Sequence, residues 1–356
     1  MNANVDTSSA SQADTTLVKP RRSLLAPFNR AGAPSILDLG FDAQPGTDEA
    51  EGMGQDELLE QTSHDLVGFP GERIGHISSG FEGERWRIRN AVWVVAQSAT
   101  GVVLLDQVYR AGYRLSFDPM INCSEYLESF VNIHDKAICL DSRANTEQLV
   151  AMLSHNLGVA GAAVDGIFFD SSMSPPAALL AHRMAMAYAL GASLQIAYEL
   201  RESPTLPNKA DRDAYWRQCS KDHSRMASAF AQTVINAMAV TNGSAMAAAI
   251  REFYDYGKLR ERYDQEVINY YRGLPVGLLK DPKAMTGGFD VMGRALNLKL
   301  PGVVYATRHD PKLDLLDPEN LGAGQEIIDA VAALQQARRN AGVKDRDSWQ
   351  VHLSKV

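Results

Sequence analysis

Cysteine is scarce in this chain of 356 residues, and long apolar runs are missing. The three cysteines, Cys123, Cys139 and Cys219, are scattered and show no C-x-x-C spacing, so the sequence excludes a disulfide framework and favours a reducing compartment. No run of 18 apolar residues occurs, which excludes a helix that crosses a membrane. Because the polar start also lacks the apolar core of a secretory signal, we expect a cytoplasmic protein.

Basic residues are also fewer than acidic ones. The protein carries 43 acidic against 35 basic residues, a formal net charge of −8, so no nucleic-acid partner is expected. Most of the excess lies in residues 1–60, which hold ten acids and four bases and have no Trp or Tyr. Such a segment cannot bury enough apolar surface to offset its ordering entropy, and we predict a disordered acidic leader.

Helical spacing of apolar residues dominates the rest of the sequence. It predicts helices over about 90–110, from Asn145 to about 160, over 175–202, through Trp216 to Met238, over 244–272 and over 324–341. Asn145 with Gln148 three residues later predicts a capping box, and Ser174-Pro175-Pro176 predicts a helix start. Short alternating runs over 113–118 and 136–141 predict two strands. The fold class is therefore mainly α (α+β) with a small sheet. The predicted units are the leader (1–60), a helical domain (61–272) and a loop-rich C-terminal extension with one helix (273–356).

Two helices carry a recognisable pattern. The first reads L-S-H-N-L-G-V-A-G-A over 153–162, and the second reads R-M-A-M-A-Y-A over 183–189. Together with the strand K-A-I-C-L-D before them and a later F-Y-D…R…Y-D segment (253–264), they resemble a bacterial family assigned to the zincin-type metallopeptidases and catalogued as a domain of unknown function. That resemblance implies a zincin-like helical domain in which L-x-H-E-L-R-H-A-x-Q and R-x-x-E-A-D-A supply a zinc site. It also implies that K-A-I-C-L-D is an edge strand that binds substrate.

The departures from that pattern fall on the positions that would do chemistry. His155, the first implied zinc ligand, is retained. The implied base glutamate is Asn156, the second histidine is Val159, and the third ligand is Met186. An amide is no proton acceptor, and neither Val nor Met offers the nitrogen or oxygen donor that zinc needs here. The resemblance therefore implies a degenerate homologue without catalytic residues, for which no metal or other cofactor is expected.

The retained side chains have simpler interpretations. His155 fits a buried histidine that is hydrogen-bonded to a carbonyl or an acid, and Arg183 fits an ion pair as well as a site. If a binding cleft persists, His155, His182, Arg183 and Cys139 are the candidates to line it. A rebuilt zinc site is the other option, with His182 and His155 joined by His134, Asp170 or Cys139.

Three functions remain open. The first is a pseudopeptidase that binds a peptide or a partner protein without cutting it, through the backbone of the K-A-I-C-L-D strand. The second is a structural or assembly protein made of helices. The third is an active metallopeptidase with a rebuilt metal site. The sequence contains no G-x-S-x-G elbow, phosphate-binding glycine loop or dinucleotide fingerprint that would indicate another enzyme class.

Overall fold

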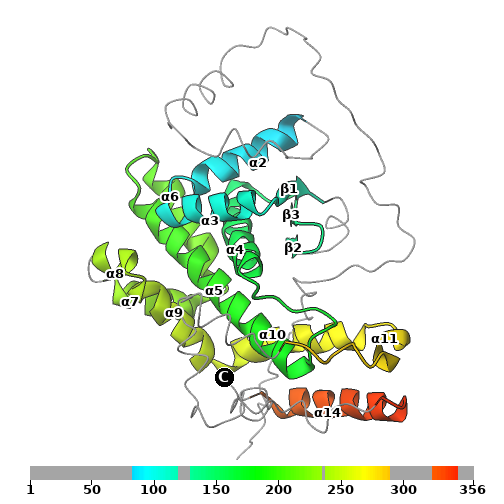
Figure 1. Ribbon diagram of the computed structural model, residues 1–356. Coiled ribbons are helices and arrows are strands. Elements are labelled where there is room, and N and C mark those ends of the chain that lie inside the picture. The colour runs from blue at the N-terminus through cyan, green and yellow to red at the C-terminus, as the bar shows by residue number, and fades with distance from the viewer. Residues whose placement is uncertain (1–81, 119–128, 235–236, 289–322, 344–356) are drawn as a thin grey trace, which may run out of the picture.

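A small three-stranded sheet lies among helices in the part of the protein that the computed structural model describes, residues 82–118, 129–234, 237–288 and 323–343 (Figure 1). The strands are β1 (Arg114–Phe117), β2 (Phe130–Asn132) and β3 (Ala137–Leu140). The helices are α2 (Glu82–Val95), α3 (Ala99–Arg110), α4 (Thr146–Val164), α5 (Pro175–Glu202), α6 (Lys209–Ser220), α7 (Ser224–Thr233), α8 (Ala237–Thr241), α9 (Ser244–Asp255), α10 (Gly257–Arg272), α11 (Val276–Lys280) and α14 (Gln325–Asn340).

This architecture confirms the predicted class, mainly α with a small sheet. The zincin-like part of the prediction, the leader and the division at residues 60 and 272 stay predictions, and the leader and Cys123 lie outside the described residues. Cys139 and Cys219 are free thiols. Within the described ranges, none of the helices combines the length and the apolar character that a membrane span requires.

Helix α5 is the centre of the packing. Ser174 caps its first turn by accepting from the Ala177 N–H, and Pro175 and Pro176 occupy positions where a missing N–H costs nothing. Its 28 residues span about 42 Å. Helices α4, α6, α9 and α10 all pack against it, and it is buried along most of its length. Figure 1 shows the sheet and α2 toward one end of the molecule and α10, α11 and α14 toward the other.

The sheet corrects one expectation. Its order is β1-β3-β2, with β3 parallel to β1 and antiparallel to β2. Strand β3 is the K-A-I-C-L-D segment, so it is the central strand and not an edge strand. Its backbone groups already pair on both sides, and an extended peptide cannot bind there by strand addition. The sequence predicted β1 and β3 correctly but not β2, whose three residues are too short to show an alternating pattern.

Three predicted helices are each broken in the structure. Between α2 and α3 the backbone turns at Ser98, whose hydroxyl accepts from the Gly101 N–H at 2.9 Å and starts a new helix. The helix predicted through Trp216 and Met238 is divided into α6, α7 and α8, with a non-helical His223 before α7. The third break lies at Tyr256, between α9 and α10. In each case the apolar spacing continues across the break, because both segments bury a face in the same core.

A buried arginine joins two parts of the C-terminal extension, α14 and the segment around α11. Arg338 on α14 has no exposed surface, and its guanidinium donates to the carbonyls of Leu278, Leu279, Asp281 and Ala284 at 3.0–3.4 Å. These carbonyls belong to the end of α11 and the turn after it, where a helix leaves acceptors unsatisfied. The predicted C-terminal helix is confirmed as α14, and α11 is an additional short helix in the segment predicted as loop.

Candidate functional site

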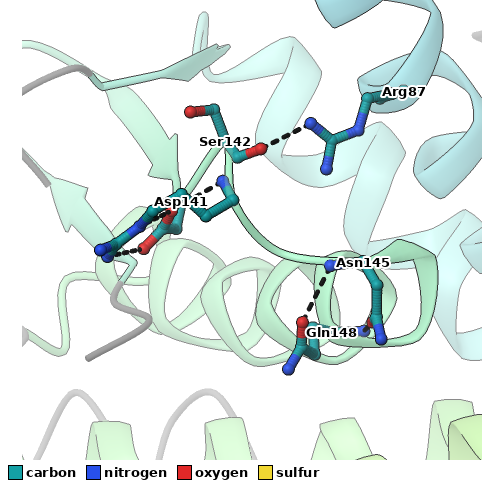
Figure 2. A network of polar contacts seen from close by, with 6 residues as sticks. Arg87, Asp141, Ser142, Asn145 and Gln148 are labelled. Atoms are coloured by element: carbon teal, nitrogen blue, oxygen red, sulfur yellow. Dashed lines mark hydrogen bonds and ion pairs between the residues drawn. The ribbon is translucent and has the colours of Figure 1, made fainter. Parts of the chain in front are cut away.

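The start of α4 fixes the position of the first motif. Asn145 and Gln148 form a complete capping box, with the Gln148 N–H donating to Asn145 Oδ1 at 2.9 Å and the Asn145 N–H donating to Gln148 Oε1 at 2.8 Å (Figure 2). The sequence predicted this cap. It sets the phase of the helix, and therefore which side of α4 carries residues 155, 156 and 159.

The loop from β3 to α4 holds the helix against the sheet and α2. Asp141 is fully buried, and its Oδ2 lies 2.6 Å from Nη2 of Arg143. Arg87 on α2 donates to the Ser142 carbonyl at 2.5 Å (Figure 2). It also donates to the Ala144 carbonyl. The contact with Arg143 gives Asp141 a structural role in this loop.

His155 and Asn156 both bring polar atoms into the interior around α4. His155 is partly exposed, but its Nε2 is buried and makes no hydrogen bond within the described residues. The Asn156 side chain is 1% exposed, and its Nδ2 is likewise buried without a partner there. The expected hydrogen bond from His155 to a carbonyl or an acid is therefore not seen at this nitrogen.

The environment of His155 strongly disfavours its charged form. Burial, aided by the nearby charges of His223, Arg262 and His182, lowers the pKa of its imidazole from 6.5 to about 3. His155 on α4 and His182 on α5 lie on helices that pack against each other.

We expect this shift to make folding sensitive to acid. Between pH 6.5 and about 3 the unfolded protein binds a proton at His155 that the folded protein does not, so stability falls as the pH falls through that window. His155→Gln should therefore reduce the pH dependence of the urea midpoint in this range. His134→Gln, in an exposed turn, is the matched control and should keep the wild-type slope. Equal slopes for wild type and His155→Gln would contradict the expectation.

Arg183 is an ion-pair residue. Its Nε and Nη2 donate to Oδ1 and Oδ2 of Asp264 on α10, each at 2.6 Å, and the two residues are 2% and 1% exposed. This fork geometry is the strongest form of an arginine–carboxylate contact. It joins the second motif on α5 to the Y-D segment on α10.

A second polar pair lies beside the first. His182 Nε2 is 3.1 Å from Glu266 Oε2, and both side chains are buried. The rings of Phe169 and Tyr263 meet the His182 ring edge to face at 5.2 and 5.8 Å between centroids. We call these two pairs, Arg183–Asp264 and His182–Glu266, the α5–α10 polar seam.

The sequence did not predict the acidic partners in this seam. Asp264 stands out in the sequence only as the end of the Y-D segment, and no pattern singles out Glu266. One signal was present, because Asp264 is in helical phase with Val267, Ile268 and Tyr271, which are all buried. An acid on an apolar helix stripe indicates a buried ion pair.

Close packing of α4 on α5 buries the remaining motif positions. Val159 is 2% exposed and Met186 has no exposed surface. At the crossing, a Cβ on Gly158 would lie only 2.6 Å from the Cα of Ala189, so this spacing of the helices requires glycine. Asn156, Val159 and Met186 therefore belong to the core and do not line an open cleft.

The other predicted residues are not gathered around His155 and His182 as ligands. Cys139 lies on β3, where burial raises the pKa of its thiol to about 11, and a contact with the Ser116 hydroxyl at 3.8 Å opposes this shift. Within the described residues, no group of three or more His, Cys, Asp or Glu side chains could hold a metal ion. The rebuilt sets that combine His155 and His182 with His134, Asp170 or Cys139 are therefore not formed.

Helices α4 and α5 pack closely together, and the motif positions lie along this contact. Residues 84–273, more than half of the chain, match the model of the Putative metallopeptidase family (DUF6782). The chain belongs to this family. No curated protein and no solved structure matches the chain.

The residues at the motif positions do not fit the zinc ion that the family resemblance implies. One imidazole, His155, offers a nitrogen donor, whereas Val159 has no donor atom and Met186 offers only a thioether. Zinc in a peptidase needs three protein ligands and an open position for water. The position of the implied base holds Asn156, which is buried and has no carboxylate to activate a metal-bound water.

Proposed function

We propose that this protein is a non-catalytic member of its family, a pseudopeptidase that binds a peptide or a partner protein without cleaving it. The observation that carries the proposal is the replacement and burial of Asn156, Val159 and Met186. A peptidase needs a general base and three ligands around an accessible metal, and these three positions supply no carboxylate or imidazole and no access.

The polypeptide ligand follows from the family. Its description as metallopeptidases makes a peptide or protein the ligand class that a member would retain after losing its chemistry. Strand β3 is excluded as the docking strand by its central position in the sheet. The proposed contact therefore uses another surface than the one that the sequence indicated.

The catalytic half of the proposal is tested by metal analysis and proteolysis. Full-length protein purified without chelators should contain much less than one zinc, iron or nickel ion per molecule, and it should not cleave casein or a peptide library when zinc is added. Stoichiometric metal together with cleavage that His155→Ala abolishes would overturn the proposal.

The binding half is tested separately with the same full-length protein. A fluorescent peptide library, read by anisotropy, should contain sequences that bind with a dissociation constant below about 1 mM. If none binds and no cleavage occurs, the binding proposal fails and the structural function is favoured.

One observation favours that second candidate, a structural or assembly protein. The retained arginine of the second motif serves packing, since Arg183 makes a bidentate contact with Asp264 inside the α5–α10 polar seam. A domain that needs this motif only for its core can act as a scaffold.

A further inference from the structure

The turn between α8 and α9 contains the only Asn-Gly pair in the sequence, Asn242-Gly243. Asn242 is exposed. Gly243 has a φ of 76°, and nothing lies within 4 Å of the position where a Cβ would be. The glycine nitrogen is therefore free of side-chain crowding, which in other residues obstructs attack on the preceding side chain.

The Asn242 side chain makes a local hydrogen bond to the backbone. Its Oδ1 accepts from the Ser244 N–H at 2.9 Å, which keeps the side chain close to the turn that contains Gly243. The donor is the first N–H of α9, a helix of 12 residues. A backbone N–H at the positive end of a helix stabilises negative charge that develops on a carbonyl oxygen.

From this geometry we propose that Asn242 is a self-modification site at which the side-chain amide is lost by deamidation. The Gly243 N–H leaves its hydrogen bond to the Val240 carbonyl and gives its proton to hydroxide. The nitrogen then attacks Cγ of Asn242, and the charge that forms on Oδ1 faces the Ser244 N–H. The new bond from this nitrogen to Cγ closes a succinimide ring as the bond from Cγ to Nδ2 breaks, and ammonia leaves with a proton from solvent. Water then opens the ring at either carbonyl, which yields aspartate or isoaspartate.

The modification would act on a helix that is packed in the core. Helix α9 buries Ala245, Met246, Ala249, Ile250 and Phe253, and its Met246 and Ile250 side chains pack against Gly191 of α5. Aspartate keeps an acceptor for the Ser244 N–H and adds a charge that the helix N-terminus favours. Isoaspartate inserts an extra methylene into the backbone, which changes the position of the acceptor for the Ser244 N–H.

Peptide mapping of the full-length protein by mass spectrometry tests the proposal. The protein is incubated under native conditions in mildly alkaline and in mildly acidic buffer, and aspartate and isoaspartate are quantified at each asparagine. Asn208 is the matched control, because it is exposed and its Oδ1 also accepts from a helix N–H, that of Ala210 at 2.9 Å, but Lys209 follows it.

We expect Asn242 to convert several-fold faster than Asn208, faster in alkali than in acid, with isoaspartate among the products. Gly243→Ala should slow the conversion, since a methyl group obstructs ring closure. The proposal is overturned if Asn242 remains intact or converts no faster than Asn208. Because this comparison is made within the wild-type protein, it holds even if Gly243→Ala does not fold.

Discussion

Replacing Arg183 with methionine is expected to lower the free energy of unfolding by about 3–5 kcal/mol. The substitution keeps most of the side-chain volume but leaves the Asp264 carboxylate, which is 1% exposed, without its bidentate partner. An uncompensated buried charge is among the most destabilising changes in a core, and the total stability of a domain is only about 5–15 kcal/mol. Urea denaturation followed by circular dichroism measures the loss.

A double variant separates the charge effect from packing. Arg183→Met combined with Asp264→Leu removes both charges, so most of the lost stability should return, because a buried ion pair is often replaceable by apolar side chains. If the single variant loses less than about 1 kcal/mol, the pair contributes no more than a surface pair does, and Asp264 is either solvated or compensated by the charge of Arg260, which also interacts with it. That result would contradict the expected dependence of the fold on the Arg183–Asp264 pair.

Val159→Arg is expected to prevent folding. Val159 is 2% exposed. It follows Gly158, the residue at which α4 packs directly against Ala189 of α5. An arginine there must either bury an unpaired charge or force the two helices apart, and each outcome costs several kcal/mol. The variant should show a greatly lowered thermal midpoint or no cooperative transition.

The control lies on the same helix. Val164→Arg makes the same substitution at a residue that is 39% exposed, and it should leave the thermal midpoint nearly unchanged. If Val159→Arg instead folds with wild-type stability, residue 159 faces solvent. The interpretation of the motif positions as core would then be wrong, and loss of peptide binding in the folded variant would place the ligand at the crossing of α4 and α5.

Local chemistry explains what was predictable about the fold. The capping box of Asn145 and Gln148, and the Ser174-Pro175 start of α5, act within one helical turn, and both are confirmed. The breaks at Ser98 and Tyr256 were not predictable because apolar spacing continues through them. A stripe of buried residues does not distinguish one long helix from two shorter ones that pack on the same core.

Contacts between distant residues explain what was not predictable about the candidate site. The sequence identified Arg183 and His182, but their partners Asp264 and Glu266 lie more than 80 residues further along the chain. Strand β3 was recognisable as a strand, whereas its central place depends on pairing with both β1 and β2. The spacing of residues along the sequence indicates neither these ion pairs nor the central place of β3.

By itself, the sequence determined the mostly helical class with its small sheet. It also determined which side chains, and therefore which donor atoms, are present at the motif positions. Asn156, Val159 and Met186 lack the donors of a peptidase in any conformation, because donor chemistry belongs to the side chain. The tertiary structure alone decided that these positions are buried, that Arg183 is paired with Asp264, and that β3 is closed to a peptide. Burial and pairing arise from how α4, α5, α10 and the sheet pack together, and packing is a property of the whole folded protein.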